Sequence, residues 1–163
     1  MEIESVEGSA GSVERVLSGM KACSWVHFAC HGMQDLSEPT QSALLLADGN
    51  LELARIIKQP LQHAEFAFLS ACQTATGDMK LEDEAVHLAA GMLLAGYRSV
   101  IATMWAIADK DGPVVADVVY SEMLHEGKPD HTRAAHALHL AVKQLRDAGE
   151  PFLSWTPFVH FGA

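Results

Sequence analysis

Three short apolar runs constrain the fold of this chain more than any other feature. They span residues 24–30 (SWVHFAC), 65–71 (EFAFLSA) and 98–105 (RSVIATMW). The first run mixes aromatic and β-branched residues without polar alternation, which is typical of a strand buried on both faces of a parallel sheet, and the second and third runs are predicted to be further strands of this sheet. Segments with helical spacing separate the runs. The sequence therefore predicts an α/β fold, a three-layer α/β/α sandwich around a mostly parallel sheet.

The segments around these runs show helix and turn signals. Ser12 is expected to cap a helix that ends near residue 22, and Asp111 to cap a later one. The last helix should bury the stripe Ala134, Ala135, Leu138, Val142 and Leu145. Helices are predicted within residues 8–22, 51–59, 81–97, 109–127 and 131–149. Further strands are predicted over 42–50, running into a turn at 48–50, and over 155–162.

Length and charge narrow the classes of function. With 163 residues the chain is expected to form one domain, 1–163. Its formal charge of −10 disfavours binding to nucleic acid, which needs clustered Lys and Arg. No apolar run approaches the roughly 20 residues of a membrane helix, so no membrane partner is expected. Three irregularly spaced cysteines argue for a reducing compartment, and the expected location is cytoplasmic.

A histidine and a cysteine follow the first two apolar runs. His31 comes directly before a glycine, and Cys72 begins the segment after the second run. Sites in parallel sheets lie beyond the carboxyl ends of the strands, and consecutive parallel strands are often neighbours. A Cys/His pair could therefore form, with a thiolate for attack and an imidazole to exchange protons. The backbone amides of Gly32 and Cys72 could then hold an oxyanion.

Other residue patterns favour structural roles. His27 and His31 have H-x-x-x-H spacing, but they lie in a strand-like run rather than on a helix, so no metal site is expected. We expect His27 to be a packed strand residue with a hydrogen-bonded ring. Cys23 and Cys30 are expected to be core thiols. A third possible function is a small-molecule α/β binding domain. The sequence contains no recognisable phosphate-binding or nucleotide-binding loop that would support it.

Several motifs in order resemble a known family. The segments HFACHG, LSACQTATGD, LEDEAVHLAAGMLLAGYRSVIATMWAIAD and PFVHFG together resemble the CHAT domain. This is a caspase-like peptidase module often found behind tetratricopeptide repeats and related to caspases and separase. The resemblance covers roughly Ser12 to Gly162, nearly the whole chain.

The resemblance implies a caspase-like fold and a cysteine peptidase that hydrolyses peptide bonds without a cofactor. It places the catalytic histidine at His31 and the nucleophile at Cys72, with the amide of Gly32 at the oxyanion. Trp105 and Asp109 become candidates for contacting the substrate residue before the cleaved bond, and Asp109 would prefer a basic side chain. Implied partners are a protein or peptide substrate and a regulatory repeat domain or other regulatory protein.

One departure from the family supports an alternative function. Complete CHAT domains have an additional strand–helix unit before the histidine strand, so this domain is expected to be N-terminally shortened, with residues 2–8 as a remnant of an early strand. The edge of the histidine strand would then be open, and open edges invite pairing. The alternative is an inactive or partner-activated interaction domain, which could form a homodimer through that edge.

Overall fold

The computed structural model describes residues 3–33, 35, 37–70, 72–73, 85–125 and 127–162. The helices are α1 (Val13–Ala22), α2 (Leu53–Ile57), α3 (Ala85–Leu94), α4 (Asp111–Met123), α5 (Ala134–Asp147) and α6 (Phe152–Trp155). The 3-10 helices are η1 (Gly8–Ala10), η2 (Pro39–Gln41) and η3 (His131–Arg133). The strands are β1 (Trp25–Phe28), β2 (His31–Met33), β3 (Ala43–Leu46), β4 (Gly49–Glu52), β5 (Phe66–Leu69), β6 (Cys72–Gln73), β7 (Ser99–Thr103), β8 (Leu124–His125), β9 (Lys128–Pro129) and β10 (Phe158–Gly162).

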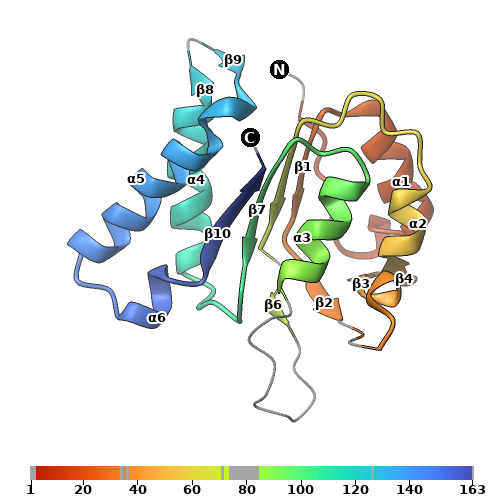
Figure 1. Cartoon of the computed structure of the whole chain (residues 1–163), viewed down its shortest axis with the longest axis horizontal. Coiled ribbons are helices and arrows are strands. Elements are labelled where there is room, and N and C mark those ends of the chain that lie inside the picture. Colours follow the sequence, from red (N-terminus) through yellow and green to blue (C-terminus); the bar gives the residue numbers. More distant parts are fainter. Residues whose placement is uncertain are drawn as a thin grey trace.

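A four-stranded sheet, here called the main sheet, has the strand order β1-β5-β7-β10. The first three strands are parallel and β10 is antiparallel to β7. Helices α4 and α5 lie on one side of this sheet and α1, α2 and α3 on the other (Figure 1). The predicted α/β/α sandwich and the predicted adjacency of the first two apolar strands are therefore confirmed.

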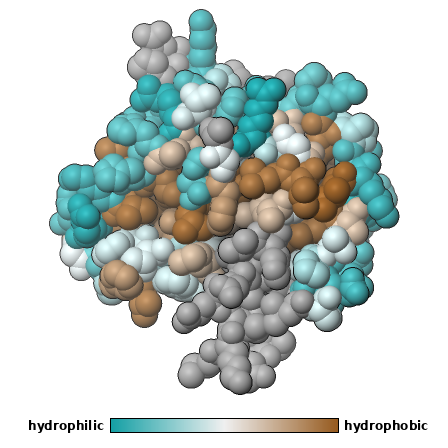
Figure 2. Space-filling model, viewed as in Figure 1, coloured by the Kyte–Doolittle hydropathy of each residue, from teal (hydrophilic) through white to brown (hydrophobic). Residues whose placement is uncertain are grey.

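The two faces of the main sheet bury separate cores. In β5, Ala67 and Leu69 belong to the core shared with α1, α2 and α3, whereas Phe66 and Phe68 belong to the core shared with α4 and α5. All four side chains are buried. This alternation follows from the two-residue period of a strand, and it explains why β5 carries no polar residue. Figure 2 shows apolar side chains across the middle of one face, with hydrophilic side chains on either flank.

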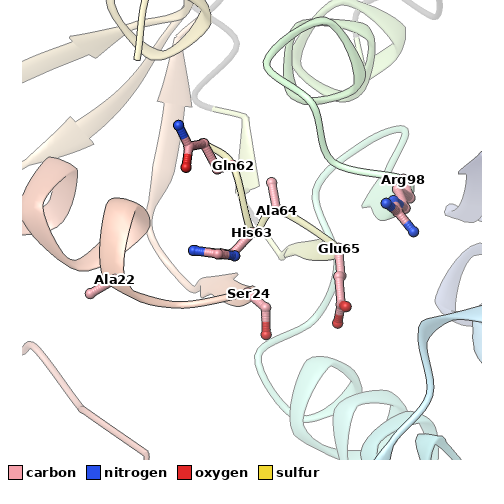
Figure 3. A pocket seen from close by; sticks show the side chains of 7 residues that line it. All are labelled: Ala22, Ser24, Gln62, His63, Ala64, Glu65 and Arg98. Carbon is pink, nitrogen blue, oxygen red and sulfur yellow. The ribbon is translucent and has the colours of Figure 1, made fainter. Parts of the chain in front are cut away.

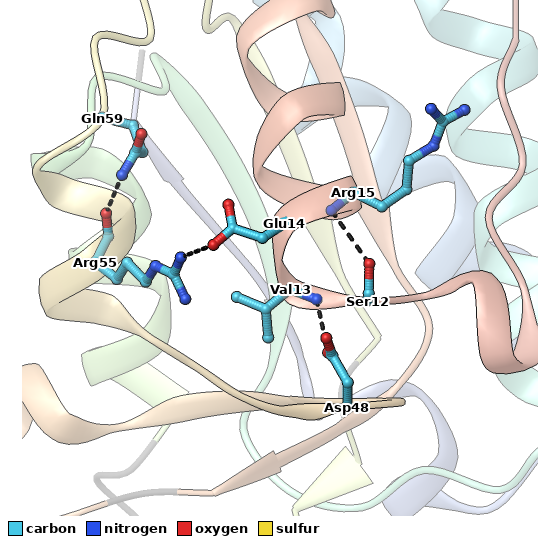
Figure 4. A network of polar contacts seen from close by, with 7 residues as sticks. All are labelled: Ser12, Val13, Glu14, Arg15, Asp48, Arg55 and Gln59. Carbon is cyan, nitrogen blue, oxygen red and sulfur yellow. Dashed lines mark hydrogen bonds and ion pairs between the residues drawn. The ribbon is translucent and has the colours of Figure 1, made fainter.

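A second four-stranded sheet, the small sheet, has the order β4-β3-β2-β6. Strands β3 and β4 form an antiparallel hairpin around the Asp48 turn. The Asp48 carboxylate accepts a hydrogen bond from the backbone N–H of Val13 at 2.8 Å, and the Ser12 hydroxyl accepts one from Arg15 N–H at 3.3 Å. Glu14 of α1 forms an ion pair with Arg55 of α2 (Figure 4). These contacts join α1, α2 and the hairpin, and they confirm Ser12 as an N-cap.

The two sheets share one strand register. Phe28 pairs with Leu69 at the end of the main sheet, and His31 pairs with Cys72 at the start of the small sheet. The separation in sequence between partners is the same in both pairs. The β1–β5 pairing is thus interrupted after Phe28 and Leu69 and then resumes as β2–β6. This continuation places the segments after the first two strands side by side.

Several local predictions were wrong. Residues 3–7 form no strand, so the segment at 2–8 is not seen as an early strand. The region 51–59 begins as strand, because Leu51 and Glu52 pair with Leu44 and Ala43 in the hairpin, and only Leu53–Ile57 is α-helical.

Two details of the later helices also differ from prediction. The N-cap of α4 is Lys110, and Asp111 lies inside the first turn without capping it, because its side chain is only 1% exposed and turned into the protein. In α5, Ala135 is exposed, while Ala137 and Ala141 are buried against α4 and the main sheet. None of the helices in the described ranges is long and apolar enough to cross a membrane.

Candidate active site

A cleft of about 470 Å³ lies beyond the carboxyl ends of β1 and β5. One wall comes from the segments that join the two sheets, and the other comes from the segment after β7 and the start of α4. A parallel sheet commonly places ligand sites at this end, because loops that follow neighbouring strands converge there. The lining residues include His27, Cys30, His31, Ser70, Ile107, Asp109, Gly112 and Pro113.

The backbone brings His31 and Cys72 together across a parallel strand pair. Their Cα atoms are direct partners in the β2–β6 register, and Gly32 pairs with Gln73 next to them. Neighbouring strands lie about 4.8 Å apart. The His31 side chain is exposed, and Gly32 is buried between β3 and β6. The Cys72 side chain lies outside the described part of the structure, and the register pairs the two backbones.

A second histidine contacts a serine in the same cleft. Nε2 of His27 lies 2.8 Å from Oγ of Ser70. The His27 ring also lies over two aromatic rings, with centroid distances of 4.7 Å to Phe68 and 5.7 Å to Tyr120. The prediction of a packed strand residue with a hydrogen-bonded ring is confirmed. Sequence reasoning missed Ser70, whose position directly after β5 was the available signal.

Burial changes the protonation of two groups in the cleft. The His27 side chain keeps an exposed face, but the apolar groups around its ring desolvate it and lower its pKa. Burial raises the pKa of the Cys30 thiol to about 11. Cys30 is therefore a neutral thiol at neutral pH, and it packs at the border of the core as predicted.

The opposite wall carries the predicted substrate contacts. Asp109 is exposed and lines the cleft. Trp105 is half-buried and is not among the described residues that line the cleft. Between Asp109 and α4, Lys110 donates a hydrogen bond of 2.6 Å to Glu150, which joins this wall to the segment before α6. Among the described side chains, no group of three His, Cys, Asp or Glu residues is arranged to hold a metal.

A second hollow lies at the other end of the main sheet. Its lining includes Ser24, Glu65 and Arg98, which directly precede β1, β5 and β7 (Figure 3). Because these strands are parallel, the hollow is at their amino ends, away from His31. Its Glu65 carboxylate accepts a hydrogen bond from the Trp25 indole at 3.2 Å. This contact gives Glu65 a structural role.

Comparison with known proteins agrees with this architecture. No curated protein matches the chain at a significant level. The family model of the CHAT domain matches residues 2–163. This family is of the caspase-like peptidase type. Because the match covers almost the whole sequence, the chain belongs to the CHAT domain family.

Proposed function

We propose that this domain is a cysteine peptidase whose nucleophile is Cys72 and whose proton carrier is His31. The observation that carries the proposal is the direct pairing of these two residues in the β2–β6 register. Residues directly opposite on adjacent strands share one face of a sheet, which is the placement that a Cys/His dyad needs. The cleft beside His31 offers space for a peptide.

The proposed reaction needs only groups of the chain, the substrate and water. His31 takes the thiol proton, and the Cys72 thiolate forms a bond to the carbonyl carbon of the scissile peptide. The backbone N–H groups of Gly32 and Cys72 hold the oxyanion, each worth about 3 kcal/mol by analogy. His31 then protonates the leaving amine as the C–N bond breaks. Water, deprotonated by His31, hydrolyses the thioester and releases the acid and the free thiol.

The negative charge of Asp109 on the opposite wall of the cleft supports a preference for a cationic substrate residue. Asp109 is exposed in the cleft that contains His31. A carboxylate at this position attracts a cationic side chain, so a Lys or Arg before the scissile bond is the proposed substrate residue. Trp105, close by in the same segment, is a candidate for packing against the aliphatic part of that side chain.

Labelling with a peptide chloromethyl ketone that ends in arginine tests the proposal. We expect one adduct on Cys72, found by mass spectrometry of the digested protein. Cys72→Ala and His31→Ala should lose it, and Asp109→Asn should slow labelling by the arginine reagent but not by a leucine reagent. Cys30→Ala is the matched control and should label normally, because the neutral Cys30 thiol is a poor nucleophile. Equal labelling of Cys72→Ala and wild type would refute the assignment.

The alternative role as an interaction domain rests on a different observation. Strand β1 is the terminal strand of the main sheet among the described residues, so one of its edges has no partner strand there. Such an edge can pair with a second copy of the chain or with a regulatory protein. Light scattering after size-exclusion chromatography would show a dimer for the wild type and a monomer for a folded Val26→Pro variant. A wild-type protein that stays monomeric at high concentration would contradict the proposed homodimer.

A further inference from the structure

Ser70 occupies the interruption between the two sheets. It follows the last main-sheet pair, Phe28 with Leu69, and it precedes the pair of His31 with Cys72 by two positions. Its backbone N–H donates a hydrogen bond to the carbonyl of Phe28 at 3.0 Å. This backbone hydrogen bond therefore links the two segments at the point where regular strand pairing stops. The Ser70 side chain adds further contacts there.

The Ser70 hydroxyl has two partners on the histidine-bearing strand. Its Oγ lies 3.3 Å from the carbonyl oxygen of Phe28 and 2.8 Å from Nε2 of His27. Both contacts are satisfied when His27 donates from Nε2 and the hydroxyl donates its own proton to the carbonyl. The His27 ring is fixed in turn by the rings of Phe68 and Tyr120. These contacts connect Ser70 to β1, β5 and α4.

We propose that His27 and Ser70 are positioning residues for the His31/Cys72 pair, because their hydrogen bond closes the interruption just before the two segments that carry the pair. This inference rests on the proposed peptidase function. His27 is four residues before His31 on one segment, and Ser70 is two residues before Cys72 on the other. Holding the first pair of residues sets the separation and register of the second, and a misplacement of about 1 Å can slow a reaction roughly 100-fold.

The same contact could be interpreted as a serine nucleophile with its base. A hydroxyl within hydrogen-bond distance of an imidazole is the signature of such a pair. Here, however, the Ser70 hydroxyl also lies 3.3 Å from the carbonyl of Phe28, and when it donates its proton to that carbonyl, Nε2 of His27 is the donor and cannot act as the base. Positioning is therefore the role that the contacts support.

Variants that separate hydrogen bonding from packing test the proposal. His27→Phe keeps a ring against Phe68 and Tyr120 and removes the donor, whereas His27→Gln keeps an N–H donor near the position of Nε2. Ser70→Ala removes the hydroxyl, and Ser70→Thr restores it. We expect the rate of chloromethyl ketone labelling at Cys72 to fall about 10- to 100-fold in the Phe and Ala variants. The Gln and Thr variants should recover most of that rate.

Two further measurements make the outcome decisive. The ring titration of His31, followed by NMR, should move in Ser70→Ala and return in Ser70→Thr, while urea unfolding shows whether each variant is folded. Folded Phe and Ala variants with wild-type labelling and His31 titration would overturn the positioning role. A fluorophosphonate adduct on Ser70 would overturn it in favour of a serine nucleophile. Absence of Cys72 labelling in wild type would instead count against the peptidase, and the His31 titration would still decide whether Ser70 positions that ring.

Discussion

Gly162 lies so close to the carbonyl of Arg98 that a Cβ atom on Gly162 would be 2.1 Å from the carbonyl oxygen. Gly162 ends β10, where it pairs with Ser99 of β7, and its φ of +113° is a conformation that side chains disfavour. The glycine that closes the PFVHFG motif is thus required by the approach of two backbones. This close approach holds β10 against β7 at the end of the main sheet.

The first prediction concerns this glycine. Gly162→Ala should lower the free energy of unfolding by about 2–4 kcal/mol, since the clash involves backbone that cannot rotate away. Urea denaturation measures the loss. Gly149→Ala is the control, because Gly149 also has a positive φ, +81°, but has open space around its Cα. It should lose only about 1 kcal/mol. Equal losses would show that the approach to Arg98 is not limiting.

The second prediction concerns the contact between α3 and α2. A Cβ on Gly91 would lie 2.6 Å from both terminal methyl carbons of Leu53, which is buried. Gly91→Ala should therefore destabilise the protein by about 1 kcal/mol, because overpacking of about 1–3 kcal/mol exceeds the roughly 1 kcal/mol gained in helix propensity. Leu53→Ala alone should cost about 2–5 kcal/mol.

A double-mutant cycle tests the cause. In the Gly91→Ala, Leu53→Ala protein the new methyl group enters space vacated by leucine, so the combined loss should be at least about 1 kcal/mol smaller than the sum of the single losses. Additive losses from urea denaturation would contradict the packing explanation.

The third prediction concerns the stability of the protein at acidic pH. Burial lowers the pKa of both His27 and His160, and His160 also lies 2.8 Å from the Ser99 hydroxyl. A histidine whose pKa is lower in the folded state binds its proton more readily when unfolded. Stability from these groups is therefore fully present above the unfolded pKa of about 6.5, and it is lost as the pH falls toward their folded pKa values.

Urea midpoints between pH 8 and pH 5 measure this effect. The midpoint should fall as the pH drops below about 6.5. His27→Gln should show a shallower fall, because it lacks one of the two responsible imidazoles. His139→Gln, which changes an exposed histidine of α5, should keep the wild-type slope. A wild-type slope in His27→Gln would show that His27 does not contribute.

The sequence predicted the features that depend on local pattern. The runs around Phe68 and Ile101 are buried strands because their apolar side chains serve two cores at once, whereas in β1, at one end of the strand order, the predicted burial on both faces is wrong and only Phe28 is buried. The adjacency of the first two strands followed from the usual order of parallel sheets, and the backbone then pairs His31 with Cys72. The labelling experiment tests the proposed dyad directly.

Features that depend on tertiary contacts were not predictable. The segment 49–52 is short and mostly polar, and it is a strand only because it pairs with β3. The position of Ser70 directly after β5 makes it a candidate, but its contact with His27 depends on the pairing of β5 with β1. In α5, Ala134, Leu138 and Leu145 are buried as predicted, but packing against α4 and the main sheet buries Ala137 and Ala141 in place of Ala135.

The break in the strand pairing has a consequence for regulation. The β2 residues 31–33 belong to neither of the two cores, so this short ladder can loosen through a local opening that costs far less free energy than unfolding the sandwich. If His31 and Cys72 react as proposed, a protein that binds or releases the chain near residues 29–30 would change their reactivity while the rest of the domain stays intact. A regulatory protein could therefore switch the proposed His31/Cys72 pair while the main sheet and its helices keep their packing.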